Sequence, residues 1–348
     1  MFSYGRAVRP LPMSNPPNPW LATSVDWIGE PPAARPRIHV DATRQVLSRN
    51  DSPDIPFAWS LNPYRGCSHA CAYCYARPTH EYLGFGAGTD FDTQIVAKLA
   101  APELLREAFE RRSWRGEVVA FAGATDPWQP IEASLRITRA CLEVCRDYLN
   151  PVAVVTKSPL VERDIDLLAS LAGAGAARAS VSLPFLDATR ARALEPWAAA
   201  PERRLKTIER LARGGVPVSV NVAPVIPGLN DEEIPAVLRA AREAGATGAG
   251  WLLLRLPGSV KAVFAERLRT ALPDRVDRVL HRIRETRGGR LYDARFGLRQ
   301  RGEGAYAEAI DSLFATAARK LGLKRRPGGE SGASPFRRPG SQLSLFPR

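Results

Sequence analysis

Short apolar runs alternate with longer segments of helical spacing between about residues 58 and 256. The expected strands are 58–61, 117–121, 152–156, 179–183, 216–222 and 250–254, and the expected helices between them are 102–112, 132–148, 162–171, 201–213 and 231–244. Strands that alternate with helices predict a parallel sheet with right-handed crossovers. Six such repeats are too few to close an eightfold barrel. We therefore predict an α/β fold with an open, partial (β/α)6 barrel.

Three further regions flank this expected core, which we place at residues 56–256. Residues 1–55 are rich in proline and predict an extended arm that wraps the body. Residues 257–323 predict a helical extension, with helices at 260–272, 275–287 and 306–321 and a possible strand at 291–296. Glycine, proline, serine and arginine dominate residues 324–348, which predicts a disordered basic tail.

The charge balance of the chain favours polyanionic partners. The 348 residues include 49 basic and 36 acidic side chains, a formal net charge of +13, and such a field attracts nucleic acid, acidic proteins or phosphate-bearing substrates. No run of about 18 apolar residues predicts a membrane span. The first residues lack the pattern of a secretory signal. We expect a cytosolic protein with no membrane partner.

Three of the five cysteines fall within eight residues, Cys67, Cys71 and Cys74, at a C-x3-C-x2-C spacing on an expected loop. An odd cysteine count in a cytosolic chain argues against a disulfide framework. Thiolates gathered on one loop suit an iron–sulfur cluster, and three ligands leave one of four irons open to a small molecule. Zinc held by these thiols and His69 or His80 is the alternative. Zinc sites more often use two separated C-x2-C pairs, which this pattern is not.

The other two cysteines, Cys141 and Cys145, share a helical face with Ile137, Val144 and Tyr148. Buried cysteine behaves as a small apolar side chain, so we expect this pair in the core.

The segment Cys67-x3-Cys71-x-Tyr73-Cys74 resembles the signature of the radical S-adenosylmethionine (radical SAM) superfamily. The resemblance implies a [4Fe–4S] cluster on the three cysteines, with S-adenosylmethionine chelating the fourth iron. It also implies that one electron, from a donor of the flavodoxin or ferredoxin type, cleaves S-adenosylmethionine to methionine and a 5′-deoxyadenosyl radical. That radical abstracts a hydrogen atom from a substrate, while the protein positions the cofactor and excludes water.

Four segments in order, 62–67, 125–132, 156–160 and 223–231, resemble the DNA repair photolyase-like branch that is related to spore photoproduct lyases. The branch implies DNA as substrate, although sequence similarity alone does not fix a reaction. In those lyases a cysteine returns a hydrogen atom to the product radical, and its position falls at about Gly123 here. Repair of the spore photoproduct through that thiol is therefore not expected.

Candidate cofactor-binding residues lie where the expected strands end, the edge at which active sites of such barrels form. Gly123 and Thr125 suit close backbone approach to the methionyl group, and Ser182 suits the ribose. Lys157 matches a lysine of the photolyase-like branch and suits the carboxylate. Tyr73 is expected against the adenine.

The tail contains a second motif. Gln342, Leu343, Leu345 and Phe346 stand in the sequence Gln-Leu-Ser-Leu-Phe, which resembles the pentapeptide by which bacterial DNA polymerases and repair proteins dock on the β sliding clamp. Apolar residues in a segment without a core suit insertion into a partner's pocket. The resemblance implies the clamp as partner and a bacterial source. A tail folded back on the body is the alternative.

Together these features predict a radical SAM iron–sulfur enzyme that acts on DNA, in lesion processing. Two alternatives stay open. One is radical chemistry on RNA, a protein or a metabolite, and the other is a non-catalytic, zinc-stabilised nucleic-acid-binding protein. No phosphate-binding loop or metalloprotease motif supports a different enzyme class.

Overall fold

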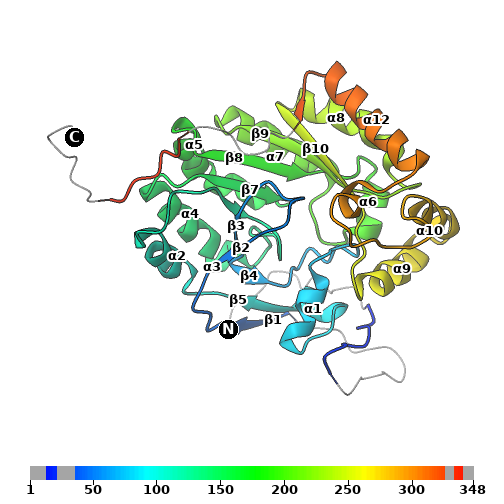
Figure 1. Ribbon diagram of the computed structural model, residues 1–348, viewed down its shortest axis with the longest axis horizontal. Helices are drawn as coiled ribbons and strands as arrows, with labels where there is room; N and C mark the ends of the chain where they lie inside the picture. Colours follow the sequence, from blue (N-terminus) through cyan, green and yellow to red (C-terminus); the bar gives the residue numbers. More distant parts are fainter. Residues whose placement is uncertain (1–12, 22–35, 326–332, 340–348) are drawn as a thin grey trace.

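The computed structural model describes residues 13–21, 36–325 and 333–339. Its main sheet curves through the centre of the molecule (Figure 1), and its strands lie in the order β11-β10-β9-β8-β7-β6-β3-β2. All neighbouring pairs are parallel except β2 with β3. The strands are β2 Leu47–Arg49, β3 Trp59–Leu61, β6 Val119–Phe121, β7 Val152–Thr156, β8 Ala177–Ser182, β9 Val218–Val225, β10 Gly248–Leu253 and β11 Lys324–Arg325. The six expected strands form consecutive neighbours, which confirms the partial parallel barrel.

Most helices connect these strands and cover the outer side of the sheet, whereas α1 lies beside the second sheet and α9 and α10 lie beside α6 (Figure 1). They are α1 Thr89–Thr93, α2 Ala101–Glu110, α3 Glu132–Leu135, α4 Ile137–Asp147, α5 Ile165–Gly173, α6 Ala188–Leu194, α7 Pro201–Arg213, α8 Ile234–Glu243, α9 Val260–Ala271, α10 Val276–Glu285, α11 Leu298–Arg301 and α12 Ala305–Lys320. The expected helix 132–148 is interrupted at Arg136, which has a left-handed backbone (φ 55°) between α3 and α4.

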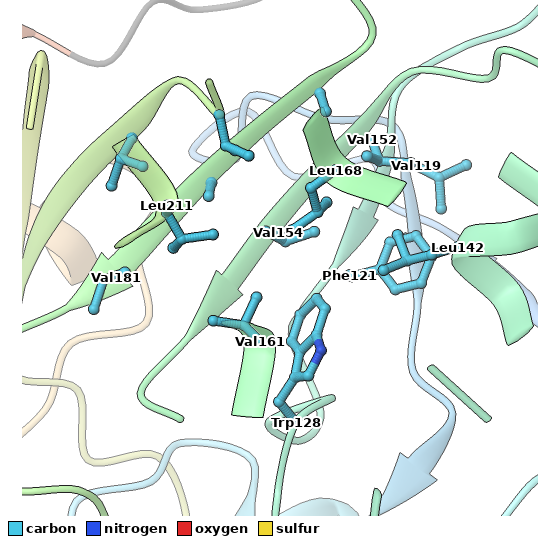
Figure 2. Close-up of a cluster of buried hydrophobic side chains, with 14 of the residues drawn as sticks. Val119, Phe121, Trp128, Leu142, Val152, Val154, Val161, Leu168, Val181 and Leu211 are labelled. Atoms are coloured by element: carbon cyan, nitrogen blue, oxygen red, sulfur yellow. The ribbon is translucent and has the colours of Figure 1, made fainter. Parts of the chain in front are cut away.

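The hydrophobic core lies between the sheet and these helices. Figure 2 shows Val119 and Phe121 of β6 and Val154 of β7 in one cluster with Leu142 of α4 and Leu168 of α5. Side chains alternate between the two faces of a strand, so the residues between these point to the concave side of the sheet. There the strands carry small residues, including Ser60, Ala120, Ala153, Ser180, Ser219 and Gly250. Val155, Arg178 and Leu252 have the same orientation, so small residues line part of this face rather than all of it.

A second, three-stranded sheet has the order β1-β5-β4, with β1 Arg37–Val40, β5 Gln94–Ala97 and β4 Tyr64–Arg65. The expected arm 1–55 thus contributes two strands, β1 here and β2 on the edge of the main sheet. Residues 13–21 also contact the body, since Met13 is buried and Asn18 donates to the carbonyls of Glu81 and Phe85.

Part of the tail departs from the expected disorder. Lys324 and Arg325 form β11 beside β10, and within 333–339 Phe336 stacks on Tyr148 with ring centroids 6.2 Å apart. Arg338 donates to the carbonyl oxygens of Phe109 and Arg111. The predicted clamp-binding residues 342–346 lie outside the described residues.

The expected strand 291–296 is wrong, because this segment forms no strand. Asp293 accepts from the Arg295 amide at 2.9 Å and from the side chains of Arg290 and Arg295, which holds this segment in an irregular conformation. No helix within 13–21, 36–325 and 333–339 has the length and apolar character needed to cross a membrane.

Candidate functional site

The three clustered cysteines lie on one loop that follows β4 directly. Its first residue, Gly66, has a φ of +77°, and a Cβ there would lie 2.8 Å from the Phe91 carbonyl oxygen and 2.9 Å from the His80 ring. The Cys67 amide donates to the same Phe91 carbonyl at 3.0 Å. Only glycine fits this turn, so the loop is pressed tightly onto the segment behind it.

All three thiols are free, Cys67 and Cys71 are buried and Cys74 is partly exposed. Burial raises the pKa of Cys67 to about 12, and it also raises the pKa values of Cys71 and Cys74. Such thiols keep their protons at neutral pH unless a positive centre binds them, since thiolate is the ligand form of cysteine. The raised pKa values therefore argue against a free nucleophilic thiolate at this loop.

Two buried side chains hold the loop in place. Gln129 Nε2 donates to the Gly66 carbonyl at 3.0 Å, and its Oε1 accepts from the Ser68 amide at 3.0 Å. Arg77, fully buried, donates through Nε and Nη2 to the Cys71 carbonyl at 3.1 and 2.9 Å, and it pairs with Asp92 at 2.9 Å. Since both bind backbone atoms of the loop, its shape does not depend on the thiols themselves.

Asp126, in the loop after β6, ties together the ends of two strands and the cysteine loop. Its Oδ1 accepts from Thr156 Oγ1 at 2.7 Å, and its Oδ2 accepts from the Lys157 amide at 2.8 Å. His69 Nδ1 lies 3.4 Å from the same carboxylate. Burial lowers the pKa of His69, which favours the neutral ring despite the nearby aspartate.

A second carboxylate, Glu195, is buried just beyond α6 and accepts hydrogen bonds from the side chains of Tyr73 and Arg204. Both donate to it, and Arg204 also donates to the Ser182 carbonyl at 3.1 Å. Burial raises the pKa of Glu195, although Arg204 opposes that change. Lys157 Nζ lies 3.9 Å from Glu195 and 5.7 Å from the Tyr73 ring centroid. Two cations thus share one carboxylate beside the cysteine loop.

The structure brings the predicted cofactor residues to the same edge. Lys157 follows β7 and Ser182 ends β8, where it pairs in register with Asn221 of β9. In the described part of the chain neither the Ser182 hydroxyl nor the Asn221 amide has a side-chain hydrogen bond. These two polar groups are available to a ligand.

Thr125 and Gly123 occupy the loop after β6. The Thr125 hydroxyl donates to the Gly66 carbonyl at 2.6 Å, so it links this loop to the cysteine loop. Gly123 has a φ of +118°, and a Cβ there would lie 3.7 Å or more from its nearest neighbour, Asn62. Its surroundings leave room for a ligand backbone.

Sequence reasoning missed Asp126, Gln129, Glu195 and Arg204. Asp126 and Gln129 stand inside the segment 125–132 that carried the family resemblance, which was the available signal. Glu195 and Arg204 had none, because the pair they form owes its place in the site to Tyr73, which is 122 residues away from Glu195.

Two residues that follow the cysteines pack into the structure. His80 is buried and its Nε2 bonds with the Gln94 carbonyl at 2.8 Å, while Glu81 accepts from Ser259. Both contribute to the support behind the loop.

The sequence pattern of the Radical SAM superfamily matches residues 61–241, more than half of the chain. The chain belongs to the radical SAM superfamily. Its cofactors are therefore a [4Fe–4S] cluster and S-adenosylmethionine, and this membership replaces the zinc alternative.

The described residues fit the cluster. Three sulfurs come from one buried loop, and Arg77, which donates to the Cys71 carbonyl, lowers the pKa of Cys74 against the effect of burial. Within 13–21, 36–325 and 333–339 no group of three or more His, Cys, Asp or Glu side chains is arranged to hold a single metal ion. A cube with an iron for each thiolate separates its ligands more widely than one ion does.

The chain also has sequence relatives among curated proteins. An uncharacterized protein of Mycobacterium tuberculosis is 40% identical over 226 residues, 64% of this chain and 66% of that protein. An uncharacterized protein of Methanocaldococcus jannaschii is 27% identical over 180 residues, 51% of this chain and 65% of that protein. The chain thus spans just under two thirds of the length of these curated relatives.

Among solved structures, a spore photoproduct lyase complexed with dinucleoside spore photoproduct aligns with a TM-score of 0.59. The alignment has 16% sequence identity and covers 83% of this chain and 81% of the lyase. At this identity the likeness establishes a shared fold.

Proposed function

We propose that this protein reductively cleaves S-adenosylmethionine and uses the resulting 5′-deoxyadenosyl radical on DNA, in the processing of a lesion. The observation that carries the radical chemistry is the position of the cysteine loop, which contacts the loop after β6 through Thr125 and Asp126, beside the end of β7 that Lys157 follows and the end of β8 at Ser182. The bound cluster and S-adenosylmethionine supply the radical, and the residues described above orient and shield it.

Four of the predicted cofactor residues, together with Asn221, have a role in this proposal, and Thr125 links the loop after β6 to the cysteine loop. Lys157, with one carboxylate already 3.9 Å away, offers its remaining donors to the methionyl carboxylate. Ser182 and Asn221 bind the ribose, and Gly123 allows close approach of the methionyl group. Tyr73 donates its hydroxyl to Glu195, so only its ring is free to lie against the adenine.

DNA as substrate is supported by the net charge of +13 and by the lyase-like fold. A damaged base pairs and stacks poorly, which lowers the cost of turning it out of the helix toward a concave site. The lyase thiol position is Gly123, and Cys141 and Cys145 are fully buried in the helical layer. In the proposed reaction, therefore, no thiol at position 123 returns a hydrogen atom to the product radical.

The test is 5′-deoxyadenosine formation by the anaerobically reconstituted protein with dithionite and S-adenosylmethionine. Ultraviolet-irradiated DNA, the same DNA without irradiation and RNA of the same sequence are compared. We expect irradiated DNA to stimulate formation several-fold above both controls. Equal rates with all three, or a higher rate with RNA, would contradict a DNA lesion as substrate and favour another radical SAM substrate.

We also propose that residues 342–346 dock the protein on the β sliding clamp. The motif begins three residues after Pro339, the last described residue of the packed segment 333–339. Short linear motifs bind in the micromolar range, so we expect such a dissociation constant for the full chain. Replacing Leu345 and Phe346 together by alanine should remove binding, and unchanged binding would reject the motif.

A further inference from the structure

A cavity of about 440 Å³ opens between α6 and α9, and none of its lining residues belongs to the cysteine loop. Its lining combines small apolar side chains, one hydroxyl and two guanidinium groups, and consists of Ala188, Thr189, Arg192, Ala193, Arg267 and Ala271. No acidic side chain is among them. The cavity thus carries a net positive charge.

The two arginines are held in place but not neutralised. Arg267 Nε donates to the Ala193 carbonyl at 2.7 Å, and Arg192 donates to the Pro196 carbonyl. Burial lowers the pKa of Arg267, with no acidic group to offset it. Within the described chain neither arginine forms an ion pair with a carboxylate, whereas Arg190 on the same helix pairs with Glu232 and Glu233. The remaining N–H groups of Arg192 and Arg267 are free to bind an anion.

The cavity lies at the rim of the proposed active site. α6 follows the end of β8, and the Leu194 carbonyl at its end accepts from the Ala72 amide of the cysteine loop at 2.9 Å. α9 follows the end of β10 and lies on the same side of the molecule as α6 (Figure 1). An anion bound here would therefore be anchored next to the opening of the barrel.

We propose that Arg192 and Arg267 bind one backbone phosphate of the nucleic-acid substrate; this inference rests on the proposed action on DNA. A guanidinium presents parallel N–H groups that match phosphate oxygens. Phosphate contacts of this kind fix the position of a strand, while a base that is turned out of it reaches the chemistry. The three alanines leave the cavity wide enough for the strand to approach.

The test compares the reconstituted wild type with the double variant Arg192→Ala, Arg267→Ala in binding a fluorescent single-stranded 20-mer of DNA. Anisotropy is measured over a series of salt concentrations. Loss of one phosphate contact should weaken binding about tenfold and reduce the slope of log K against log salt by about 0.7. The matched control is Arg269→Ala with Arg213→Ala, which removes two exposed charges that do not line the cavity.

The outcomes separate this inference from the proposed function. Equal affinity and slope in the double variant and the control would reject the phosphate site while DNA binding itself stands. A wild type that binds no DNA would reject the proposed substrate as well. The same cavity chemistry suits a small phosphate ester, so inorganic pyrophosphate binding is measured by calorimetry. Pyrophosphate binding that the double variant loses, together with unaltered DNA binding, would assign the cavity to a small phosphorylated molecule and overturn the nucleic-acid contact.

Discussion

The two groups of cysteines in this chain are alike in burial but differ in the charged side chains that surround them. Cys141 and Cys145 lie one turn apart on α4 in the main core, and burial raises their pKa values as it does for Cys67, Cys71 and Cys74. Around the first group most neighbours are apolar side chains, and the charged groups that act on Cys141, Glu103 and Glu132, are acidic. Around the second, Arg77, Lys157 and Glu195 are within electrostatic reach.

This difference shows that burial of a thiol does not reveal its role. A helix fixes its side chains on one face, so the α4 pair serves packing. A loop held by its backbone can point three sulfurs at one centre. The supporting cations then favour the thiolate form once a metal binds.

The largest expected effect comes from removing the support of the loop rather than its ligands. Arg77→Met deletes donors to the Cys71 carbonyl and leaves Asp92 as an unpaired buried carboxylate. Breaking a buried pair in this way costs about 3–5 kcal/mol of stability. We expect urea unfolding to shift accordingly and iron per chain to fall after reconstitution. A variant with wild-type stability and iron content would show that the loop shape does not depend on Arg77.

The next largest expected effect is a loss of affinity for S-adenosylmethionine when Lys157 is replaced. Lys157→Met removes the proposed partner of the methionyl carboxylate, and a charged hydrogen bond is worth about 1.5–3 kcal/mol. We expect the dissociation constant of S-adenosylmethionine to rise roughly 10- to 100-fold while iron content stays unchanged. Lys206→Met, on the exposed face of α7, is the matched control. Equal affinities in the two variants would remove Lys157 from the site.

A smaller effect is expected from the α4 cysteines. Cys141→Ala leaves a small void in the core, and the loss of a buried group of this size costs about 1–2 kcal/mol. Thermal unfolding should register this cost, while iron and sulfide per chain remain at wild-type values. Iron loss in this variant would break the distinction between the two groups of cysteines.

The smallest expected effect is a pH dependence of the free energy of unfolding, and it comes from Glu162 rather than from a thiol. Burial raises the pKa of Glu162, but hydrogen bonds from Arg203, Thr207 and Arg210 outweigh it and the net pKa is lowered. A lowered pKa in the folded state gives stability that is present above the unfolded value of about 4.3 and is lost as pH falls through the folded value.

The stability advantage of the wild type over Glu162→Gln should therefore shrink on acidification below about pH 4.3. Because Arg203 and Arg210 are partly exposed, solvent screening keeps the advantage below about 1 kcal/mol. Urea unfolding of both proteins between neutral and acidic pH measures it. An advantage that is constant across this range would contradict the assigned ion pairs.

Much of the fold could be predicted because local signals agreed with the tertiary structure. The helix Pro201–Arg213 has its predicted bounds, since proline begins it and Gly214-Gly215 follows it. Residues 291–296 do not form the predicted strand, because Asp293 binds the side chains of Arg290 and Arg295 close to it in sequence. An apolar pattern does not reveal such local polar contacts.

The site was predictable only in part. The cysteines, Lys157 and Ser182 stood in recognisable motifs or at the ends of expected strands. The network of Glu195, Arg204 and Tyr73 depends on contacts between distant segments, which periodicity does not encode.

The most direct test of the central claim is to measure iron, acid-labile sulfide and 5′-deoxyadenosine in the wild type and in Cys71→Ala, both reconstituted anaerobically. The account predicts about four irons per wild-type chain with S-adenosylmethionine cleaved under dithionite, and loss of both in Cys71→Ala. A wild type that holds one zinc and no iron, or a Cys71→Ala variant that keeps its cluster and its 5′-deoxyadenosine, would contradict it.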